Sequence, residues 1–496
     1  MFRKLSLLLT HLVVLTLLLQ PVASATSPGL IGSHPDFNAT AAKEEGYWYS
    51  RYSMNYLTQL SGLGVRFTID PALIAQMKPM ADADPNDGDF VRWDEGSATV
   101  QAVYASGDPH YAQTFNEAVI TSRLWDPATF DTTITSRAMG WTIVKEVEWA
   151  KQFHVDSHFG TPTDNFGAHW RFIGMILMVE AKAQFQYITQ HLMNGQGLIS
   201  NSDGTIDWSG QWVMLEALSD LGQALDAPHM PLSVTNRYSD PGAAATIRAA
   251  ADNLFHQLLS RRPADAEELS LALQALTWYG STANFIGDRA AAVGMIHRHG
   301  NELMRADTST PTLKAFAIRG LIEAYRTTTN DRYLDGAANL FNALVAEYDV
   351  AHGRFTSQNS YTIDNIGTIL GAVNSLKLFA GATVDQVMVE TIFSGFFESS
   401  VNISGLIQSA PPKFVARDPF EQNDPNIYYG YPGLPVPPLA GPPFGIAPVL
   451  GTEVTWDGNQ WQLTNGRFDS AGAMHAANEF IWFHNDEVNG FPVISN

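Results

Sequence analysis

The stretch that decides the fold is residues 311–348, PTLKAFAIRGLIEAYRTTTNDRYLDGAANLFNALVAEY. In its first half, apolar residues recur at helical spacing and also cover the opposite face. This pattern predicts a helix over 312–327 that is buried almost all round. A polar turn follows, and Asp331 is then placed to cap a second helix over 331–348, which has one apolar stripe and one polar face. A buried helix followed by an amphipathic one predicts the inner and outer helices of an α/α toroid.

Helical patterns of the same kind occur along most of the chain, and few segments alternate as a strand does. They predict further helices at about 47–61, 94–106, 109–122, 135–153, 168–194, 208–226, 243–260, 265–279, 285–305, 363–379, 384–398 and 470–484. We therefore predict an all-α fold, an α/α toroid of about six to seven helical hairpins. An open solenoid or an irregular bundle is the alternative.

Residues 411–467 are the exception to this pattern, because prolines crowd their first part. Proline lacks the backbone N–H that helices and central strands use, so a loop is predicted there. A small β-hairpin is predicted from Glu453 to Leu463, with Asp457-Gly458 as a two-residue turn. Helices of one style flank the segment on both sides, which favours a loop and hairpin folded over the toroid. A linker is the alternative.

The N-terminus has the pattern of a secretory signal peptide over residues 1–25. Arg3 and Lys4 precede an apolar run from Leu5 to Leu19, and Ala23-Ser24-Ala25 fits a cleavage site. We expect a secreted protein, periplasmic or extracellular, that has no membrane partner after cleavage. An uncleaved N-terminal anchor is the alternative.

These patterns divide the chain into four expected parts. They are the signal peptide at 1–25, the toroid at 26–410, the Pro-rich loop and hairpin at 411–467, and a C-terminal helix at 468–496 that completes the toroid.

The composition is acidic, with 50 acidic and 29 basic residues and a formal net charge of −21. Nucleic acids and anionic membranes are bound through lysine and arginine, so neither is an expected partner. The chain has no cysteine, which excludes disulfides, thiolate metal sites and cysteine nucleophiles. A carbohydrate or another small neutral substrate suits this charge better, and no cofactor is predicted.

In a toroid the loops that lead into the inner helices gather at one end, so the starts of these helices are where a site is expected. Several starts carry an acid beside aromatic or polar side chains. The candidate catalytic residues are Asp364, Asp207, Asp94 and Glu95, and the candidate substrate-binding residues beside them are Trp93, Trp208, Trp212, Tyr361 and Asn365. Paired carboxylates cleave glycosidic bonds by acid/base catalysis, and aromatic rings stack on sugars. Helix capping is the alternative role of each aspartate.

Two further groups of residues are candidates. His169, Trp170 and His475 are predicted to bind substrate, the last from the C-terminal helix. As an alternative, residues 154–169 offer nitrogen and oxygen ligands for a zinc-like ion, namely His154, Asp156, His158 and His169. No P-loop, dinucleotide fingerprint, nucleophile elbow or H-E-x-x-H pattern is present.

Residues 311–379 resemble the α/α toroids called six-hairpin glycosidase-like. The phrases Gly320-Leu321-Ile322-Glu323-Ala324-Tyr325 and Tyr348-Asp349-Val350-Ala351-His352-Gly353-Arg354-Phe355 carry the resemblance. It implies the toroid and carbohydrate substrates, but no particular catalytic residue. We therefore expect a secreted carbohydrate-active enzyme that hydrolyses glycosidic bonds, with a polysaccharide lyase less favoured. A non-catalytic glycan-binding or scaffold protein is one alternative, and a metal-dependent enzyme using the 154–169 cluster is another.

Overall fold

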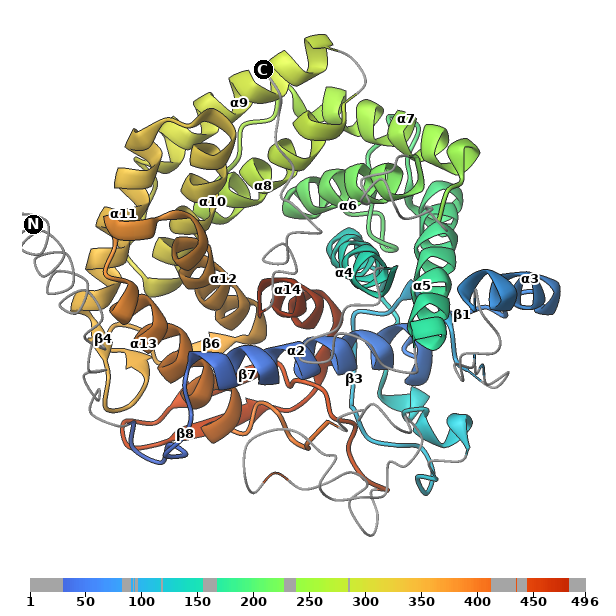
Figure 1. Ribbon diagram of the computed structural model, residues 1–496, viewed down its shortest axis with the longest axis horizontal. Helices are drawn as coiled ribbons and strands as arrows, with labels where there is room; N and C mark the ends of the chain where they lie inside the picture. The colour runs from blue at the N-terminus through green and yellow to red at the C-terminus, as the bar shows by residue number, and fades with distance from the viewer. Residues whose placement is uncertain are drawn as a thin grey trace, which may run out of the picture.

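The structure is a computed structural model, which describes residues 30–82, 91, 93, 97–116, 119–154, 167–226, 238–283, 286–411, 434 and 444–480 (Figure 1). The expected signal peptide and most of the Pro-rich loop lie outside the described residues. So do Asp94, Glu95, Asp156 and His158, and the side chain of His154.

Six helices form a closed inner ring, in which each packs against the next and the last packs against the first (Figure 1). They are α4 (Ser136–His154), α6 (Trp208–Asp226), α8 (Ala266–Thr282), α10 (Pro311–Thr328), α12 (Ile363–Phe379) and α14 (Ser470–Phe480). Their interior-facing positions are largely apolar and join one continuous hydrophobic core. This arrangement confirms the all-α toroid.

An outer helix packs on each inner one, which makes six hairpins (Figure 1). The outer helices are α5 (Gly167–Tyr187), α7 (Pro241–Leu258), α9 (Ile286–Leu303), α11 (Asp331–Ala346), α13 (Gln386–Phe397) and α2 (Ala39–Asn55). Five of these hairpins consist of consecutive helices. The sixth joins the two ends of the described chain, because α14 packs on α2.

The hairpin of α10 and α11 has the burial that its sequence predicts. Nearly all residues from Ala315 to Ala324 are buried, whereas α11 buries one stripe and exposes Arg332, Asp335 and Asn339. The cap differs from the prediction, because Asn330 precedes the helix and its side chain accepts a hydrogen bond from the Arg332 N–H at 3.3 Å. Asp331 is instead the first helical residue.

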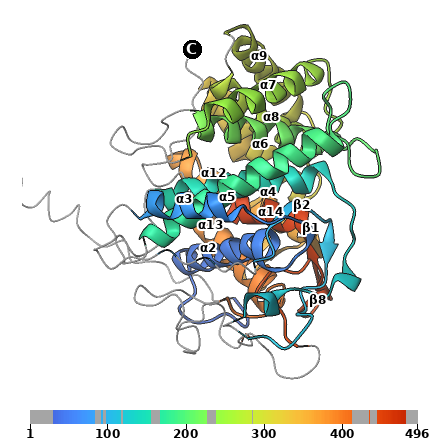
Figure 2. The same ribbon diagram turned by 90° about the vertical axis from the view of Figure 1, so that its right-hand side faces the viewer.

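The strands are short and antiparallel. They form the pairs β1 (Gly64–Arg66) with β2 (Val100–Val103), β3 (Ser106–Gly107) with β9 (Phe468–Asp469), and β4 (Tyr348–Asp349) with β5 (Arg354–Phe355), and the three-stranded sheet of β6 (Ser360–Thr362), β7 (Glu453–Trp456) and β8 (Trp461–Asn465). Figure 2 shows β1, β2 and β8 gathered at one end of the ring.

The predicted hairpin is present as β7 and β8, but its turn is longer than two residues. Trp456 pairs with Trp461, so four residues form the loop. The Asp457 carboxylate accepts hydrogen bonds from the N–H groups of Asn459 and Gln460 at 2.8 and 2.9 Å. Gly458 supplies the left-handed backbone, with a φ of 101°. The aspartate therefore stabilises a wider turn than its Asp-Gly pair suggests.

The helices predicted at 94–106 and 109–122 are wrong. The described residues there form β2, β3 and a 3₁₀ turn, η2 (Ile120–Arg123), because Val100–Val103 pairs with a distant strand. Helix α3 (Pro71–Ala81) has no counterpart in the prediction, although Asp70 caps it and Pro71 begins it. The remaining short elements are η1 (Tyr56–Leu60), η3 (Pro127–Thr129), η4 (Ile188–Leu192), η5 (Gly381–Thr383) and η6 (Glu398–Ile403), of which η1, η4 and η6 are π-helical.

None of the helices in the described part of the chain has the length and apolar character needed to span a membrane.

Candidate active site at the mouth of the ring

The six inner helices begin at the same end of the ring, because an outer helix returns the chain between each inner helix and the next (Figure 1). Strands β6 and β9 lead directly into α12 and α14, so the small sheets lie at this end as well. We call the first turns of the inner helices, with the residue before each, the mouth.

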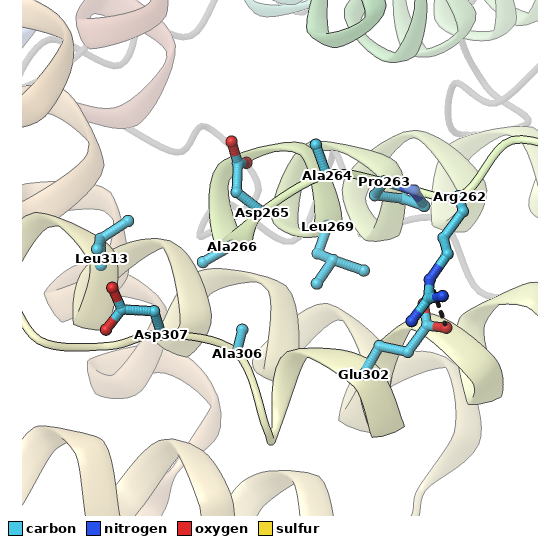
Figure 3. A pocket seen from close by; sticks show the side chains of 10 residues that line it. All are labelled: Arg262, Pro263, Ala264, Asp265, Ala266, Leu269, Glu302, Ala306, Asp307 and Leu313. Atoms are coloured by element: carbon cyan, nitrogen blue, oxygen red, sulfur yellow. Dashed lines mark ion pairs between the residues drawn. The ribbon is translucent and has the colours of Figure 1, made fainter.

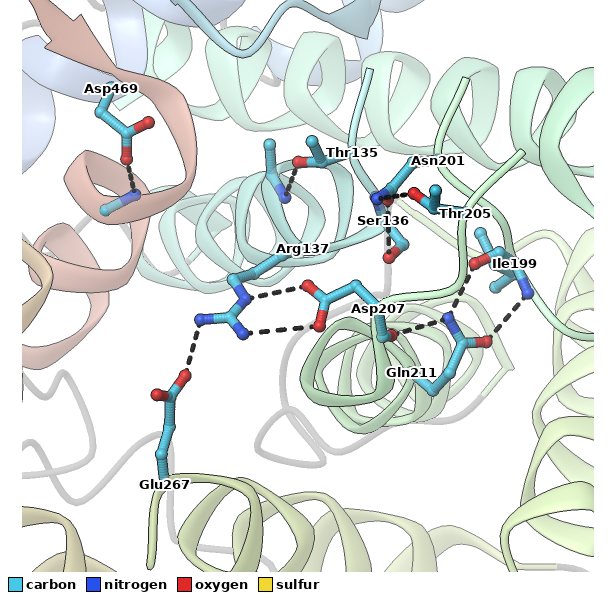
Figure 4. A network of polar contacts seen from close by, with 12 residues as sticks. Thr135, Ser136, Arg137, Ile199, Asn201, Thr205, Asp207, Gln211, Glu267 and Asp469 are labelled. Carbon is cyan, nitrogen blue, oxygen red and sulfur yellow. Dashed lines mark hydrogen bonds and ion pairs between the residues drawn. The ribbon is translucent and has the colours of Figure 1, made fainter. Parts of the chain in front are cut away.

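Arg137 in the first turn of α4 is the centre of a charged cluster at the mouth (Figure 4). Its Nε donates to Asp207 Oδ2 at 3.1 Å, and its Nη2 lies 3.5 Å from Asp207 Oδ1. Its Nη1 donates to Glu267 Oε1 at 2.7 Å. About a quarter to a third of each of these three side chains is exposed, so solvent and a ligand can reach the cluster.

The way in which α4 and α6 begin holds Arg137 beside Asp207. Thr135 Oγ1 accepts a hydrogen bond from the Ala138 N–H at 3.1 Å and so caps α4. The adjacent helix approaches closely because it has Gly210 in its first turn. A Cβ atom there would clash with Ser136 Oγ and would lie 3.0 Å from Asp207 Oδ2. The glycine thus allows the first turns of α4 and α6 to meet.

Asp364 in the first turn of α12 belongs to the same cluster. The capping role is taken by Thr362, whose Oγ1 accepts from the Asn365 N–H at 3.2 Å, while Asn365 Oδ1 accepts from the Thr362 N–H at 3.4 Å. Burial raises the pKa of Asp364, and the nearby positive charge of Arg137 opposes the shift. The Asp364 carboxyl group is therefore left for a function other than capping.

Asp469 lies next to Asp364. Its Oδ2 accepts a hydrogen bond from the Gly472 N–H at 2.7 Å, at the start of α14. Burial raises its pKa, and the negative charge of Asp364 raises it further, while Arg137 lowers it. Two carboxyl groups from neighbouring inner helices therefore lie near each other and near one guanidinium.

Glu267 in the first turn of α8 completes the set. Burial raises its pKa, which the charge of Arg137 lowers and that of Asp364 raises. The cluster thus consists of four carboxyl groups, from Asp207, Glu267, Asp364 and Asp469, around Arg137. Three of the four retain a proton more readily than a free side chain does, because burial raises their pKa.

The prediction had placed Asp207 and Asp364 at the mouth, and the structure brings them together through Arg137. Sequence reasoning missed Arg137, Glu267 and Asp469. The missed residues stand within two residues of the predicted starts of three helices, at 135, 265 and 470. Selecting only acids that stand beside aromatic residues left them out.

His475 lies deeper in the ring than the acids of the mouth and is buried. Its Nε2 is 3.1 Å from Thr368 Oγ1, and its ring centroid is 4.8 Å from that of Trp141. Burial lowers its pKa to about 4, so the imidazole is neutral at pH 7. Its exposed fraction is only 3%. The predicted contact with substrate is therefore not supported by this position.

Most of the aromatic side chains that were predicted to bind substrate are packed in the interior of the protein. Tyr361 and Trp212 are fully buried and Trp170 nearly so. The Tyr361 hydroxyl donates to Gln358 O at 2.9 Å, and Trp212 Nε1 donates to Glu268 Oε1 at 3.3 Å. These three rings cannot offer a face to a sugar.

The other predicted binding residues are less enclosed. Trp208, at the start of α6, is half-buried, with the Arg261 guanidinium 4.6 Å from its ring centroid. Trp93 and His169 are half-buried as well, against Phe172 and Trp170 respectively. Trp208 is the one predicted aromatic side chain that the structure places at the mouth.

A pocket of about 550 Å³ lies beside the mouth (Figure 3). Its apolar surface comes from Ala266, Leu269, Ala306 and Leu313, and its charged rim from Arg262, Asp265, Glu302 and Asp307. The Asp265 carboxylate caps α8 by accepting from the Glu268 N–H at 2.9 Å, two residues from Glu267. The pocket therefore adjoins the carboxyl cluster at the start of α8.

Most of the residues in the metal-binding alternative have no described side chain. Of its four residues, His169 alone has a described side chain. Within the described ranges, no group of three or more histidine, aspartate or glutamate side chains is arranged to hold a metal ion.

Comparison of the chain with models of known protein families gives no match, and comparison with curated protein sequences gives none either. The fold and the chemistry of the mouth therefore carry the functional argument.

Proposed function

We propose that this protein is a secreted glycoside hydrolase whose active site is the mouth of the ring. The observation that carries the proposal is the cluster of four carboxyl groups around Arg137 (Figure 4). Hydrolysis of a glycosidic bond requires one carboxyl group that holds a proton and another that is ionised. Such a cluster can supply both forms side by side.

Asp364 is the proposed general acid. Burial raises its pKa, so its protonated form persists to higher pH, and its carboxyl group is not used to cap the helix. It would donate a proton to the glycosidic oxygen as the bond to the sugar breaks.

Asp207 is the proposed ionised partner. Two contacts with the Arg137 guanidinium hold its carboxylate in place. It would take a proton from the attacking water, or attack the sugar directly, depending on its separation from the acid in the complex. The hydroxyl of water then becomes part of the new reducing end.

The charge of the mouth favours a neutral substrate. Four carboxyl groups face one arginine, so an anionic polysaccharide would be repelled. A lyase acting on uronic acids would need cationic side chains to neutralise the substrate carboxylate. This balance favours hydrolysis of neutral glycans, and the adjoining pocket at α8 offers space for a further part of the substrate.

The resemblance of residues 311–379 to six-hairpin glycosidase-like proteins agrees with this proposal. The signal-like pattern of residues 1–25 agrees with a substrate outside the cell.

The test is a screen of the secreted protein against neutral and anionic polysaccharides, with D364N and D207N as variants. We expect release of reducing ends from a neutral glycan, and a loss of about 10²–10⁴-fold in kcat for each variant. D331N is the matched control, because Asp331 is an exposed acid in the first turn of an outer helix. Unchanged kcat in D364N would remove Asp364 from the mechanism, and cleavage of anionic glycans alone would contradict the substrate class.

A non-catalytic glycan-binding protein is the second candidate, and one observation favours it. Arg137 joins α4 to both α6 and α8, as a purely structural ion-pair network would. In that case wild-type protein would bind glycans in a pull-down assay without releasing products. D207N and E267Q would then lower the unfolding temperature and leave binding unchanged.

A further inference from the structure

A second buried group of acids lies in the wall of the ring, away from the mouth. Glu146 of α4 and Glu180 of α5 are both fully buried. Gln184 Nε2 donates to Glu146 Oε1 at 2.7 Å, and Gln59 Nε2, from the π-helix η1, lies 3.3 Å from Glu180 Oε2. We call these four residues the wall cluster.

Three oxygen atoms of the wall cluster remain unsatisfied. Glu146 Oε2, Glu180 Oε1 and Gln184 Oε1 are buried and accept no hydrogen bond from any described residue. Gln184 is itself fully buried, and its amide nitrogen contacts Glu146, so its free oxygen belongs to the same cluster. A buried acceptor without a donor is costly, and three in one cluster indicate a missing positive partner.

The charge of the wall cluster leads to the same conclusion. The described groups that act on these two acids are each other and the two glutamine amides, with no lysine or arginine among them. Burial raises the pKa of both acids. Two buried carboxylates without a cation are strongly unfavourable.

Several other buried acids in the described part of the chain have cationic partners. Lys151 contacts Glu148 at 3.1 Å and also Asp220. Arg319 Nε contacts Glu479 Oε2 at 3.2 Å. The wall cluster differs from these in having only amide neighbours.

We propose that the wall cluster binds one calcium ion, which ties α4 to α5 and to η1. Carboxylate and amide oxygens are the ligands that calcium prefers, whereas zinc prefers nitrogen and sulfur. Magnesium usually keeps several of its waters, which a fully buried cluster does not favour. The role is structural and independent of the proposed function at the mouth.

The test uses the full chain, purified, treated with EDTA and dialysed into calcium-free buffer. We expect isothermal titration with CaCl₂ to give one site, which E146Q should lack, and saturating calcium to raise the unfolding temperature by about 3–5 °C. Magnesium at the same concentration should give a smaller rise. A calcium-insensitive wild-type protein would overturn the proposal, and the two acids would then share a proton.

Two variants locate the ion. E146Q should lose the calcium-dependent rise in unfolding temperature, and E45Q should keep it. Glu45 is the matched control, because it is a buried acid with an amide partner, Asn402, at 2.6 Å in another part of the protein. If E146Q does not fold, Q184M removes one proposed ligand and should weaken calcium binding about tenfold. A wild-type response in whichever variant folds would place the ion elsewhere and contradict the proposal.

Discussion

Arg137 and Glu267 lie in inner helices that are not neighbours, yet their side chains meet at 2.7 Å. Helix α6 stands between α4 and α8 in the ring, and its Asp207 binds the same guanidinium. One side chain thus joins the first turns of three consecutive inner helices.

Replacing this arginine should affect both stability and the acids of the mouth. R137M should lower the free energy of unfolding by about 1–2 kcal/mol, because the lost contacts are partly exposed charged hydrogen bonds. Loss of the positive charge should also raise the pKa of Asp364, and because the proposed general acid must be protonated, the alkaline limb of a pH–activity profile should move to higher pH. Urea unfolding and the pH profile measure the two effects. R332M, on the exposed face of α11, should change neither.

Gly210 should be irreplaceable, because a Cβ atom at this position would meet Ser136 Oγ. We expect G210A to lower the free energy of unfolding by about 1–3 kcal/mol and to disturb the contact of Arg137 with Asp207. The matched control is G294A, at an exposed position of α9 with nothing within 4 Å of the added atom. That variant should gain about 0.5–1 kcal/mol, because alanine is the better helix former. Equal stability of the two variants would contradict the close approach of α4 and α6.

Thr329 ends α10 in the left-handed conformation, with a φ of 52°. Glycine adopts this conformation without steric cost, so T329G should raise the free energy of unfolding by about 1 kcal/mol. T328G, one residue earlier and still within the helix, should lower it by a similar amount. Thermal unfolding of both variants beside wild type tests the sign of each change.

Glu45 should make stability depend on pH. Burial raises the pKa of this carboxyl group to about 7, above its ordinary value of 4.5. Its neutral form is favoured in the folded protein, so its contribution to stability is complete below about pH 4.5 and is lost as the pH rises through 7. E45Q cannot ionise and should lose roughly 3 kcal/mol less than wild type between pH 4.5 and 8. Parallel urea curves for the two proteins at each pH would show that Glu45 does not titrate in this range.

The sequence predicted most of the helices, because their signals are local. The bounds of α6 and α12 match the prediction at 208–226 and 363–379, where apolar periodicity begins at a clear break in the chain. The strands at 100–107 were missed because pairing with β1 and β9 depends on residues far away in the chain. Local periodicity cannot report such partners.

The site could be predicted only in part, for a similar reason. Asp207 and Asp364 follow from the rule that inner helices begin at one end. Their partner Arg137 depends on which first-turn side chain points inward, and on a glycine that lets two helices approach. Those properties belong to the packed ring and are not visible in any single segment.

The closure of the ring by α2 and α14 has a consequence for the order of folding. Helix α2 precedes the inner helix on which it packs, α14, by the other ten helices of the ring. Its buried side chains therefore meet this partner only after those ten helices have been synthesised. Shortened chains that lack α14 should consequently expose apolar surface at both open ends of the ring and aggregate, whereas the finished chain hides both at once.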